Sequence, residues 1–451
     1  MEHSLHFIGI GGIGMSAIAK IMLHNGFSIS GSDVAESRLT RDLIAAGAKI
    51  SYGHAAENIP VDAEAVVYSS AVKADNVEMQ EALSRGLKIY KRAEMLAYLM
   101  SVKDGIGVAG AHGKTTASAM IATMLEKNGC DPTVVIGGML PVIGGNAKAG
   151  DGPSLVAEAD ESDGTFLLLM PKIAVITNIE ADHLDYYHDL DAIVEAFAQY
   201  LRQVPEDGFS VVCSDCEILR ELCEKIPGRY IRYGLEAEGD YQARDLQHEN
   251  NGVSADVYYR GEKLGRLRLN VIGTHNVCNA LAAIAIGREL GLSFQQCAAG
   301  LLHFTGTGRR YELLAERDGL KVVDDYAHHP TEIAATIQAA RAQGVKKCWP
   351  YFSPIAIAAP RKCIKNLLLL CGMQTEFCSA SFTPRLSSRF PVSAPAWLWM
   401  RCVPWGIIMC IMPPLWMMPF LFCRKNSRMK SCSWSWAQGM YVHSVNAMPL
   451  T

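Results

Sequence analysis

A glycine-rich turn, set between an apolar strand pattern and a helical pattern of small residues, constrains the fold of this chain most. The strand pattern includes Ile106 and Val108, and the turn over residues 110–116 reads GAHGKTT. Backbone N–H groups and the positive end of a helix meet phosphates at such a turn. Lys114 is placed to reach β- and γ-phosphates, and the Thr115 hydroxyl is placed to hold Mg²⁺. The turn predicts a nucleoside triphosphate site, although Val108 stands where the usual motif has a glycine.

A second glycine turn lies near the N-terminus, where GIGGIG at 9–14 leads into a helical pattern over Met15–Leu23. Another strand pattern, Phe27–Ser30, is followed by Asp33, 19 residues after Gly14. This spacing is that of a dinucleotide fingerprint with its ribose-binding acid, and a glycine turn without a ligand is the alternative. The glycines indicate that a diphosphate can approach the backbone closely, but they do not say which one.

Two acidic clusters follow predicted strands in the middle of the chain. The strand Ser154–Ala157 leads into EADESD at 158–163, and the strand Ile173–Thr177 leads into NIEADHLD at 178–185. Ligands of open parallel sheets bind at the carboxyl ends of the strands. Oxygen donors with one imidazole suit Mg²⁺ or Mn²⁺ better than Zn²⁺. Each cluster alone is compatible with a solvated loop, but two of them after a phosphate-binding turn favour a site.

Polar clusters also mark two later segments. His275, Asn276 and Asn279 lie within about one turn of an alanine-rich helical pattern, where amides can read a purine edge or cap the helix. The strand pattern at 321–329, KVVDDYAHH, ends in two acids, a tyrosine and two histidines, and Pro330 and a helical pattern follow. A strand end of this kind again indicates a site.

Bulk composition excludes several classes of protein. The net charge is -4 and no basic block is present, so we expect no nucleic-acid partner. The N-terminal MEHSLHFIGI has no basic segment before a cleavable apolar stretch, so we expect no signal peptide, a cytoplasmic protein and reduced thiols. Cys213 and Cys216 have no partners at zinc-site spacing and are expected to be ordinary thiols.

Six motifs, in this order and spacing, resemble those of the Mur ligase family. They are GIGGIGMSAIA at 9–19, GAHGKTT at 110–116, AEADESD at 157–163, TNIEADHLDYY at 177–187, GTHNVCNALAAIAI at 273–286 and DDYAHHPTEI at 324–333. The resemblance covers about residues 5–347 and implies an α/β protein of three domains. These are a Rossmann-like UDP-sugar domain over 1–103, a central P-loop ATPase domain over 104–314, and the start of a Rossmann-like C-terminal domain over 315–347.

The resemblance also implies a reaction of peptidoglycan synthesis. ATP phosphorylates the carboxylate of UDP-N-acetylmuramate to an acyl phosphate, and the amine of L-alanine then displaces phosphate. ATP and Mg²⁺ (or Mn²⁺) are the implied cofactors, and the two other substrates are the implied partners. Such catalysis consists mostly of positioning and charge stabilisation around the transferring phosphoryl group. The oligomeric state stays open.

The family motifs carry residue roles onto this chain. The implied catalytic residues are Lys114, Glu158, His183 and Arg310, and the implied metal positions are Thr115, Glu158 and His183. The implied ATP-binding residues are Gly110, Ala111, His112, Gly113, Lys114, Thr115, Thr116, His275, Asn276, Asn279 and Asp325. The implied UDP-sugar residues are Gly9, Gly11, Gly12, Gly14, Asp33, His54, Ser69 and Ser70. The implied residues on the amino-acid side are Tyr326, His328 and His329. Two mild departures from the family pattern are Ala111 and Ala327.

The last quarter of the chain differs from the rest in composition. Residues 348–451 hold eight of the 14 Cys, all 7 Trp and 9 of the 19 Met, but only one acid, Glu376, and 3 of the 39 Gly. The apolar stretch Ala394–Phe422 is interrupted by Arg401 and several prolines, so we expect no membrane insertion. We expect this tail to pack poorly or to be disordered, and a divergent C-terminal domain is the alternative.

A shifted reading frame accounts for the tail. The family would show FQPHR followed by further arginines after residue 347, where this chain reads CWPYFSPIAIAAPRKCIKN. Joining the third base of each codon with the first two of the next, from Lys347 onward, allows VLALFQPHRYSRTAEMYKE. The missing motif then reappears at its proper place. We interpret 348–451 as an out-of-frame tail that leaves the C-terminal domain truncated or scrambled.

Features of the sequence are also compatible with three other functions. The same motifs occur in the ligase that attaches a recycled murein peptide to the UDP-sugar. A non-catalytic remnant that binds UDP-sugar or ATP fits the loss of the arginine motif. An NAD-dependent dehydrogenase fits the first glycine turn but leaves the turn at 110–116 unexplained.

Overall fold

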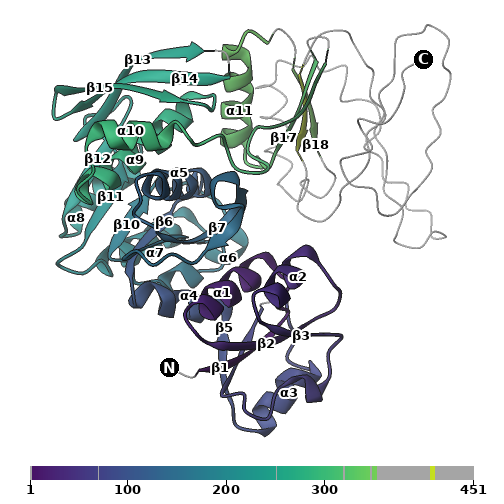
Figure 1. Cartoon of the computed structure of the whole chain (residues 1–451). Coiled ribbons are helices and arrows are strands. Elements are labelled where there is room, and N and C mark those ends of the chain that lie inside the picture. Colours follow the sequence, from purple (N-terminus) through teal and green to yellow (C-terminus); the bar gives the residue numbers. More distant parts are fainter. Residues whose placement is uncertain are drawn as a thin grey trace, which may run out of the picture. The chain divides into compact units, whose positions relative to one another are not determined.

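Three β-sheets organise the part of the chain that the structure describes (Figure 1). The structure is a computed structural model, and it describes residues 3–69, 71–249, 251–317, 320–345, 348–352 and 407–411. Ser70, which we assigned to the UDP-sugar site, and most of the tail lie outside these residues.

The first sheet has five parallel strands in the order β3-β2-β1-β4-β5. The strands are β1 (Ser4–Ile8), β2 (Ser28–Asp33), β3 (Lys49–Tyr52), β4 (Ala65–Tyr68) and β5 (Lys88–Lys91). The helices between and after them are α1 (Ile13–His24), α2 (Arg38–Ala45), the short 3₁₀ helix η1 (Ala56–Asn58), α3 (Val77–Ser84) and α4 (Arg92–Ser101).

Alternation along β1 sends side chains to both faces of this sheet. Leu5 and Phe7 are fully buried in the core that also contains Met15 of α1. Ile8 instead packs with Met79 of α3 on the other face. Because each face is covered by helices, the strands can be apolar on both sides, as in doubly wound folds.

The second sheet has ten strands in the order β15-β14-β13-β12-β11-β10-β6-β9-β7-β8. They are β6 (Asp104–Ala109), β7 (Thr133–Leu140), β8 (Gly145–Lys148), β9 (Ser154–Glu158), β10 (Ile173–Ile176), β11 (Phe209–Cys213), β12 (Tyr230–Gly234), β13 (Tyr241–Glu249), β14 (Gly252–Tyr259) and β15 (Glu262–Leu269). Its helices are α5 (Lys114–Lys127), η2 (Pro141–Ile143), η3 (Thr165–Leu168), α6 (Leu184–Tyr187), α7 (Leu190–Arg202), α8 (Glu217–Lys225), α9 (Thr274–Glu289) and α10 (Phe294–Leu301). Within the sheet, the neighbouring strands β13, β12, β11, β10, β6, β9 and β7 pair in parallel. At the two edges, β8 on one side and β14 and β15 on the other pair in antiparallel fashion.

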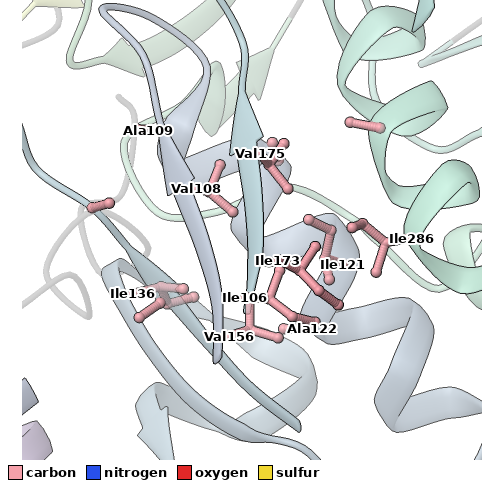
Figure 2. Close-up of a cluster of buried hydrophobic side chains, with 14 of the residues drawn as sticks. Ile106, Val108, Ala109, Ile121, Ala122, Ile136, Val156, Ile173, Val175 and Ile286 are labelled. Carbon is pink, nitrogen blue, oxygen red and sulfur yellow. The ribbon is translucent and has the colours of Figure 1, made fainter. Parts of the chain in front are cut away.

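The central strands and two buried helices form one dry core (Figure 2). Ile106 and Ile173 of the neighbouring strands β6 and β10 lie near Ile121 of α5, and Ile286 of α9 lies beside them. All four side chains are at most 3% exposed. Burying each such side chain stabilises the fold by about 1.5–3 kcal/mol, so this core fastens α5 and α9 to the strands β6 and β10.

The third sheet has four strands in the order β16-β17-β19-β18. They are β16 (Glu312–Arg317), β17 (Leu320–Asp325), β18 (Cys348–Phe352) and β19 (Ile407–Ile411). Helix α11 (Pro330–Ala342) packs Ile333 and Ile337 against Val323 of β17. The boundary that we placed after residue 314 therefore falls inside β16.

Two short pieces of the tail differ from our expectation of poor packing. β19 pairs in parallel with both β17 and β18. Short strands of β-branched and aromatic residues fit a sheet whatever their origin, so this pairing does not by itself identify a selected sequence. The rest of the expected out-of-frame tail lies outside the described residues.

Candidate active site

The turn between β6 and α5 has the shape that its glycines predict. Gly110 has φ +132°, and Gly113, the N-cap of α5, has φ +86°. A Cβ at Gly110 would lie 2.2 Å from Thr177 Oγ1, so only glycine fits there. Asn178 holds the turn from the end of β10, because its side chain accepts from the His112 N–H and donates to the His112 carbonyl, both at 2.9 Å.

Lys114 is held inside this turn by a carboxylate. Its Nζ donates to Glu161 Oε1 at 2.7 Å and to the Gly110 carbonyl at 2.6 Å. Burial raises the pKa of Glu161, while the charge of Lys114 opposes that rise. Glu161 Oε2 is buried and has no hydrogen-bond partner among the described residues. Lys114 is therefore paired with a carboxylate whose burial costs free energy, and an anionic ligand could replace that carboxylate as the partner of the lysine.

Thr115 and Glu158 meet beside the lysine. Thr115 Oγ1 donates to Glu158 Oε2 at 3.2 Å, and the Gly137 N–H donates to Glu158 Oε1 at 2.7 Å. Burial raises the pKa of Glu158 in spite of these bonds. Hydroxyl and carboxylate oxygens are the donors that Mg²⁺ prefers, and a cation there would relieve the burial of the carboxylate. The residues thus fit a magnesium ion.

His183, the third implied metal position, lies near the same carboxylate oxygen of Glu161 as Lys114 does. Its Nε2 is 3.8 Å from Glu161 Oε1, and its backbone has φ +51°. Tyr187 fixes this region by donating its hydroxyl to the Glu161 carbonyl at 2.6 Å. The two acidic clusters therefore meet through Glu161, as expected for strand ends at one edge of a sheet.

His112 is enclosed by carboxylates and joins the turn to α11. Its Nε2 lies 3.3 Å from Glu180 Oε2, and its Nδ1 lies 3.4 Å from Glu332 Oε1. The two acids raise the pKa of His112 to about 9, against the effect of burial. His329 stacks on the His112 ring at 4.7 Å between centroids. Arg310 Nη1 approaches Glu332 Oε1 at 3.4 Å, so Arg310 also belongs to this cluster.

The Asp325 carboxylate accepts hydrogen bonds from backbone N–H groups around the end of β17. Its Oδ1 accepts from the Ala327 N–H at 2.8 Å, and its Oδ2 accepts from the Tyr311 N–H at 3.2 Å. The Arg309 guanidinium lies over the Tyr326 ring, with its Cζ 4.9 Å from the ring centroid. The ring centroids of Tyr326 and His328 are 5.6 Å apart. Tyr326 and His328 thus lie together, while Asp325 holds the turn.

The residues expected to read a purine edge lie in the first turns of α9. Asn276 donates to the Ile272 carbonyl at 2.7 Å, which is a structural use of that amide. A Cβ at Gly113 would lie 2.9 Å from Asn279 Oδ1, so Asn279 lies against the turn between β6 and α5. His275 precedes Asn276 in the same turn and is exposed to solvent. Of the three, Asn279 stands nearest the turn.

The N-terminal glycine turn closes on Asp33. Gly9 has φ +78° and donates its N–H to the Ser32 carbonyl at 2.9 Å. The Gly11 N–H donates to Asp33 Oδ2 at 2.7 Å, and Gly12 is the N-cap of α1. A Cβ at Gly14 would lie 2.9 Å from Arg92 Cδ. Asp33 therefore shapes the turn itself.

His54 belongs to a buried network that the sequence analysis missed. Glu78, fully buried in α3, accepts from Ser32 Oγ at 2.5 Å and from Asn58 Nδ2 at 2.6 Å, and lies 3.5 Å from His54 Nδ1. Contacts with His6 and these donors lower the pKa of Glu78 to about 2 in spite of burial. Ser69 lies beside Gly9, where a Cβ on the glycine would be 3.5 Å from the Ser69 Cβ.

Other partners of the predicted residues were also missed. Glu161 and Asn178 stood within the acidic clusters, but nothing in their spacing separated them from solvated neighbours. Glu332 had a local signal, because it lies three residues after His329, the N-cap of α11, as in a capping box. Its contact with His112 depends on tertiary structure.

No helix among the described residues is long and apolar enough to cross a membrane.

Three family models match the chain in succession. Residues 4–104 match the Mur ligase family catalytic domain, 108–287 match the Mur ligase middle domain, and 309–353 match the Mur ligase glutamate ligase domain. The UDP-N-acetylmuramate–L-alanine ligase of Pelotomaculum thermopropionicum is 53% identical over 340 residues, which cover 75% of this chain and 74% of the relative.

Solved structures agree with this match. The UDP-N-acetylmuramate–alanine ligase of Thermotoga maritima superimposes with a TM-score of 0.70 and 28% identity, over 90% of this chain and 95% of the other. The UDP-N-acetylmuramate:L-alanyl-γ-D-glutamyl-meso-diaminopimelate ligase of Neisseria meningitides gives 0.62 and 31%, over 68% and 100%. With the phosphate turn and strand-end acids in place, this chain belongs to the Mur ligase family.

Proposed function

We propose that this protein joins L-alanine to UDP-N-acetylmuramate with hydrolysis of ATP to ADP and phosphate, as a cytoplasmic step of peptidoglycan synthesis. The observation that carries the proposal is the lysine of the phosphate turn, held at 2.7 Å by a buried strand-end carboxylate. The names of relatives near 50% identity supply the substrates. A dehydrogenase would leave Lys114, Thr115 and Glu158 without a role.

The first step transfers a phosphoryl group. A carboxylate oxygen of UDP-N-acetylmuramate attacks the γ-phosphorus of ATP, the bond to the β,γ-bridging oxygen breaks, and ADP leaves with the electron pair. Lys114 would exchange Glu161 for the β- and γ-phosphate oxygens and neutralise the charge that develops there. Arg310, whose side chain already faces Glu332 at 3.4 Å, would serve nearby phosphate oxygens.

The second step forms the amide. The neutral amine of L-alanine attacks the acyl carbon, and the tetrahedral intermediate collapses with loss of phosphate and a proton from nitrogen. We place Tyr326, His328 and His329 on the amino-acid side. His329 is suited to hold a neutral imidazole there, because burial and the charge of His112 lower its pKa.

Thr115, Glu158 and His183 would hold Mg²⁺ or Mn²⁺. A bound ion would supply neutralisation of phosphate charge and a fixed orientation for the γ-phosphoryl group. The adenine would lie toward Asn279 and His275. The UDP diphosphate would lie at the Gly9–Gly14 turn, with Asp33, His54, Ser69 and Ser70 around the nucleotide.

We further propose that turnover requires the arginine segment that an intact reading frame would encode after Lys347. The test compares this chain with a frame-restored chain carrying FQPHRYSRT after residue 347. Product formation from UDP-N-acetylmuramate, L-alanine and ATP is followed together with phosphate release. We expect product from the restored chain only. Product at equal rates from both chains would contradict this proposal about the tail.

The same assay separates the other functions. Replacing L-alanine by the murein tripeptide tests the recycling ligase, which a solved relative at 31% identity represents. A restored chain that binds ATP but makes no product with either acceptor would be a binding remnant. Resequencing the gene across the codons for residues 346 and 347 tests the frame directly.

A further inference from the structure

Two cysteines far apart in sequence meet at the end of a central strand. Cys213 ends β11, and Cys278 lies in the second turn of α9. Their Sγ atoms are 3.7 Å apart. Cys216, which shares the CxxC motif with Cys213, has its Sγ 4.0 Å from the Ile179 carbonyl instead. The tertiary fold thus replaces the local pair with a non-local one.

The third group near this pair is already engaged. Asp215 lies close enough to both sulfurs to form a candidate metal cluster with them. However, its Oδ1 accepts from the N–H groups of Glu236 and Ala237 at 3.0 and 2.8 Å, and its Oδ2 accepts from Leu235 at 2.8 Å. A carboxylate that closes a turn in this way is a poor third ligand, so the two sulfurs stand as a dithiol.

The surroundings favour reaction between the two sulfurs. The contact with the Cys278 thiol lowers the pKa of Cys213, and the backbone N–H groups of Asp215 and Cys216 add to this effect. The same contact raises the pKa of Cys278, and so does burial. Cys213 is buried and Cys278 is partly exposed, so Cys278 is the residue of the pair that lies nearer to solvent. A thiol with a lowered pKa beside a second, resolving thiol is the usual arrangement of an oxidisable pair.

We propose that Cys213 and Cys278 form a peroxide-sensitive thiol pair whose disulfide restrains the start of α9. Hydrogen peroxide is the two-electron oxidant. One thiolate attacks a peroxide oxygen and releases hydroxide, which leaves a sulfenic acid. The second thiol attacks that sulfur, and water leaves as the S–S bond forms. In total, two thiols and one hydrogen peroxide give one disulfide and two waters.

Disulfide formation would move the start of α9, which lies beside the turn between β6 and α5. The sulfurs must approach from 3.7 Å to about 2.05 Å, which draws the second turn of α9 toward β11. Cys278 precedes Asn279, whose Oδ1 lies against Gly113 of the phosphate turn. A shift of Asn279 is therefore passed to that turn. We therefore predict that the disulfide weakens ATP binding. This prediction rests on the function proposed above, whereas formation of the disulfide does not.

The first experiment maps the bond in the full chain. Reduced protein is treated with limited hydrogen peroxide, free thiols are alkylated, and peptides are analysed by mass spectrometry with and without reduction. We expect a crosslink between the peptides of Cys213 and Cys278, present in the Cys216→Ala control and absent in Cys213→Ala and Cys278→Ala. A Cys213–Cys216 crosslink, or oxidation to sulfenic and sulfinic acids without a crosslink, would overturn the proposal. So would protection of both thiols by stoichiometric Zn²⁺.

The second experiment measures the restraint. Backbone hydrogen exchange of residues 274–282 should slow on oxidation and recover on reduction, in the wild type and in Cys216→Ala but not in Cys278→Ala. Unchanged exchange in a crosslinked sample would refute the restraint. The affinity for a non-hydrolysable ATP analogue should fall about fivefold or more on oxidation, within the usual range for coupled sites. Reduced protein that binds no analogue would refute the proposed function, while the crosslink and exchange results would still decide the thiol pair.

Discussion

The two glycine turns of this protein use the same backbone device for different chemistry. Gly9–Gly14 and Gly110–Gly113 each link a buried parallel strand to a helix N-terminus. The first turn donates its Gly11 N–H to Asp33 and carries no lysine. The second turn contains Lys114, which binds Glu161 at 2.7 Å. The two turns thus share a backbone shape and differ in the charged side chains beside it, and under the proposed function this difference separates a turn that binds phosphate from one that also transfers it.

Removing the lysine should separate the two turns most sharply. Lys114→Ala in the frame-restored chain is expected to lower product formation by about 100- to 1,000-fold, because a charge that stabilises the transition state is lost. Binding of UDP-N-acetylmuramate should stay unchanged when measured by calorimetry. Lys127→Ala, at the exposed end of the same helix, is the matched control. An equal loss of UDP-sugar affinity in Lys114→Ala would show that the two turns do not work separately.

Alanine in each turn should reveal unequal strain. Gly110→Ala places a Cβ 2.2 Å from Thr177 Oγ1 at φ +132°, whereas at Gly9 the nearest atom is 3.5 Å away at φ +78°. We expect a loss of about 3 kcal/mol in unfolding free energy for Gly110→Ala and about 1 kcal/mol for Gly9→Ala. Denaturant unfolding of the full chain measures both. Equal losses would mean that the second turn is no more constrained than the first.

A pH titration should detect the histidine of the second turn. The pKa of His112 is raised to about 9 by Glu180 and Glu332, above its ordinary value in an unfolded chain. Its stabilisation is therefore complete below about pH 6.5 and is lost as pH rises through about 9. Between those limits the wild type should lose about 2 kcal/mol more stability than His112→Gln, because the side chain is 11% exposed and only weakly screened. Parallel stability curves for the two proteins would contradict the assignment.

The smallest effect is expected at the first turn. In the frame-restored chain, Asp33→Asn keeps an oxygen acceptor for the Gly11 N–H but removes the charge, so the KM for UDP-N-acetylmuramate should rise about fivefold with kcat nearly unchanged. Asp42→Asn, on the exposed face of α2, is the control. A fall in kcat without a change in KM would move Asp33 from binding to catalysis.

Much of the fold was predictable because its signals are local. The strand and helix patterns around both glycine turns were confirmed by β1, α1, β6 and α5. Strand-end acids were recognisable because parallel strands place their carboxyl ends at one edge. The partners of these residues were not predictable, since Glu161, Glu332 and Glu78 carry no pattern that distinguishes a buried carboxylate from a solvated one.

The sequence by itself determined the family, the order of the three sheets along the chain and the position of the two glycine turns, because spacing and periodicity are properties of the chain. It also located the change in composition after residue 347. Only the tertiary structure decided which charges pair, as in Lys114 with Glu161, and which cysteines meet, as in Cys213 with Cys278. Such pairs join residues 47 and 65 positions apart, and packing rather than local sequence sets the distance between them.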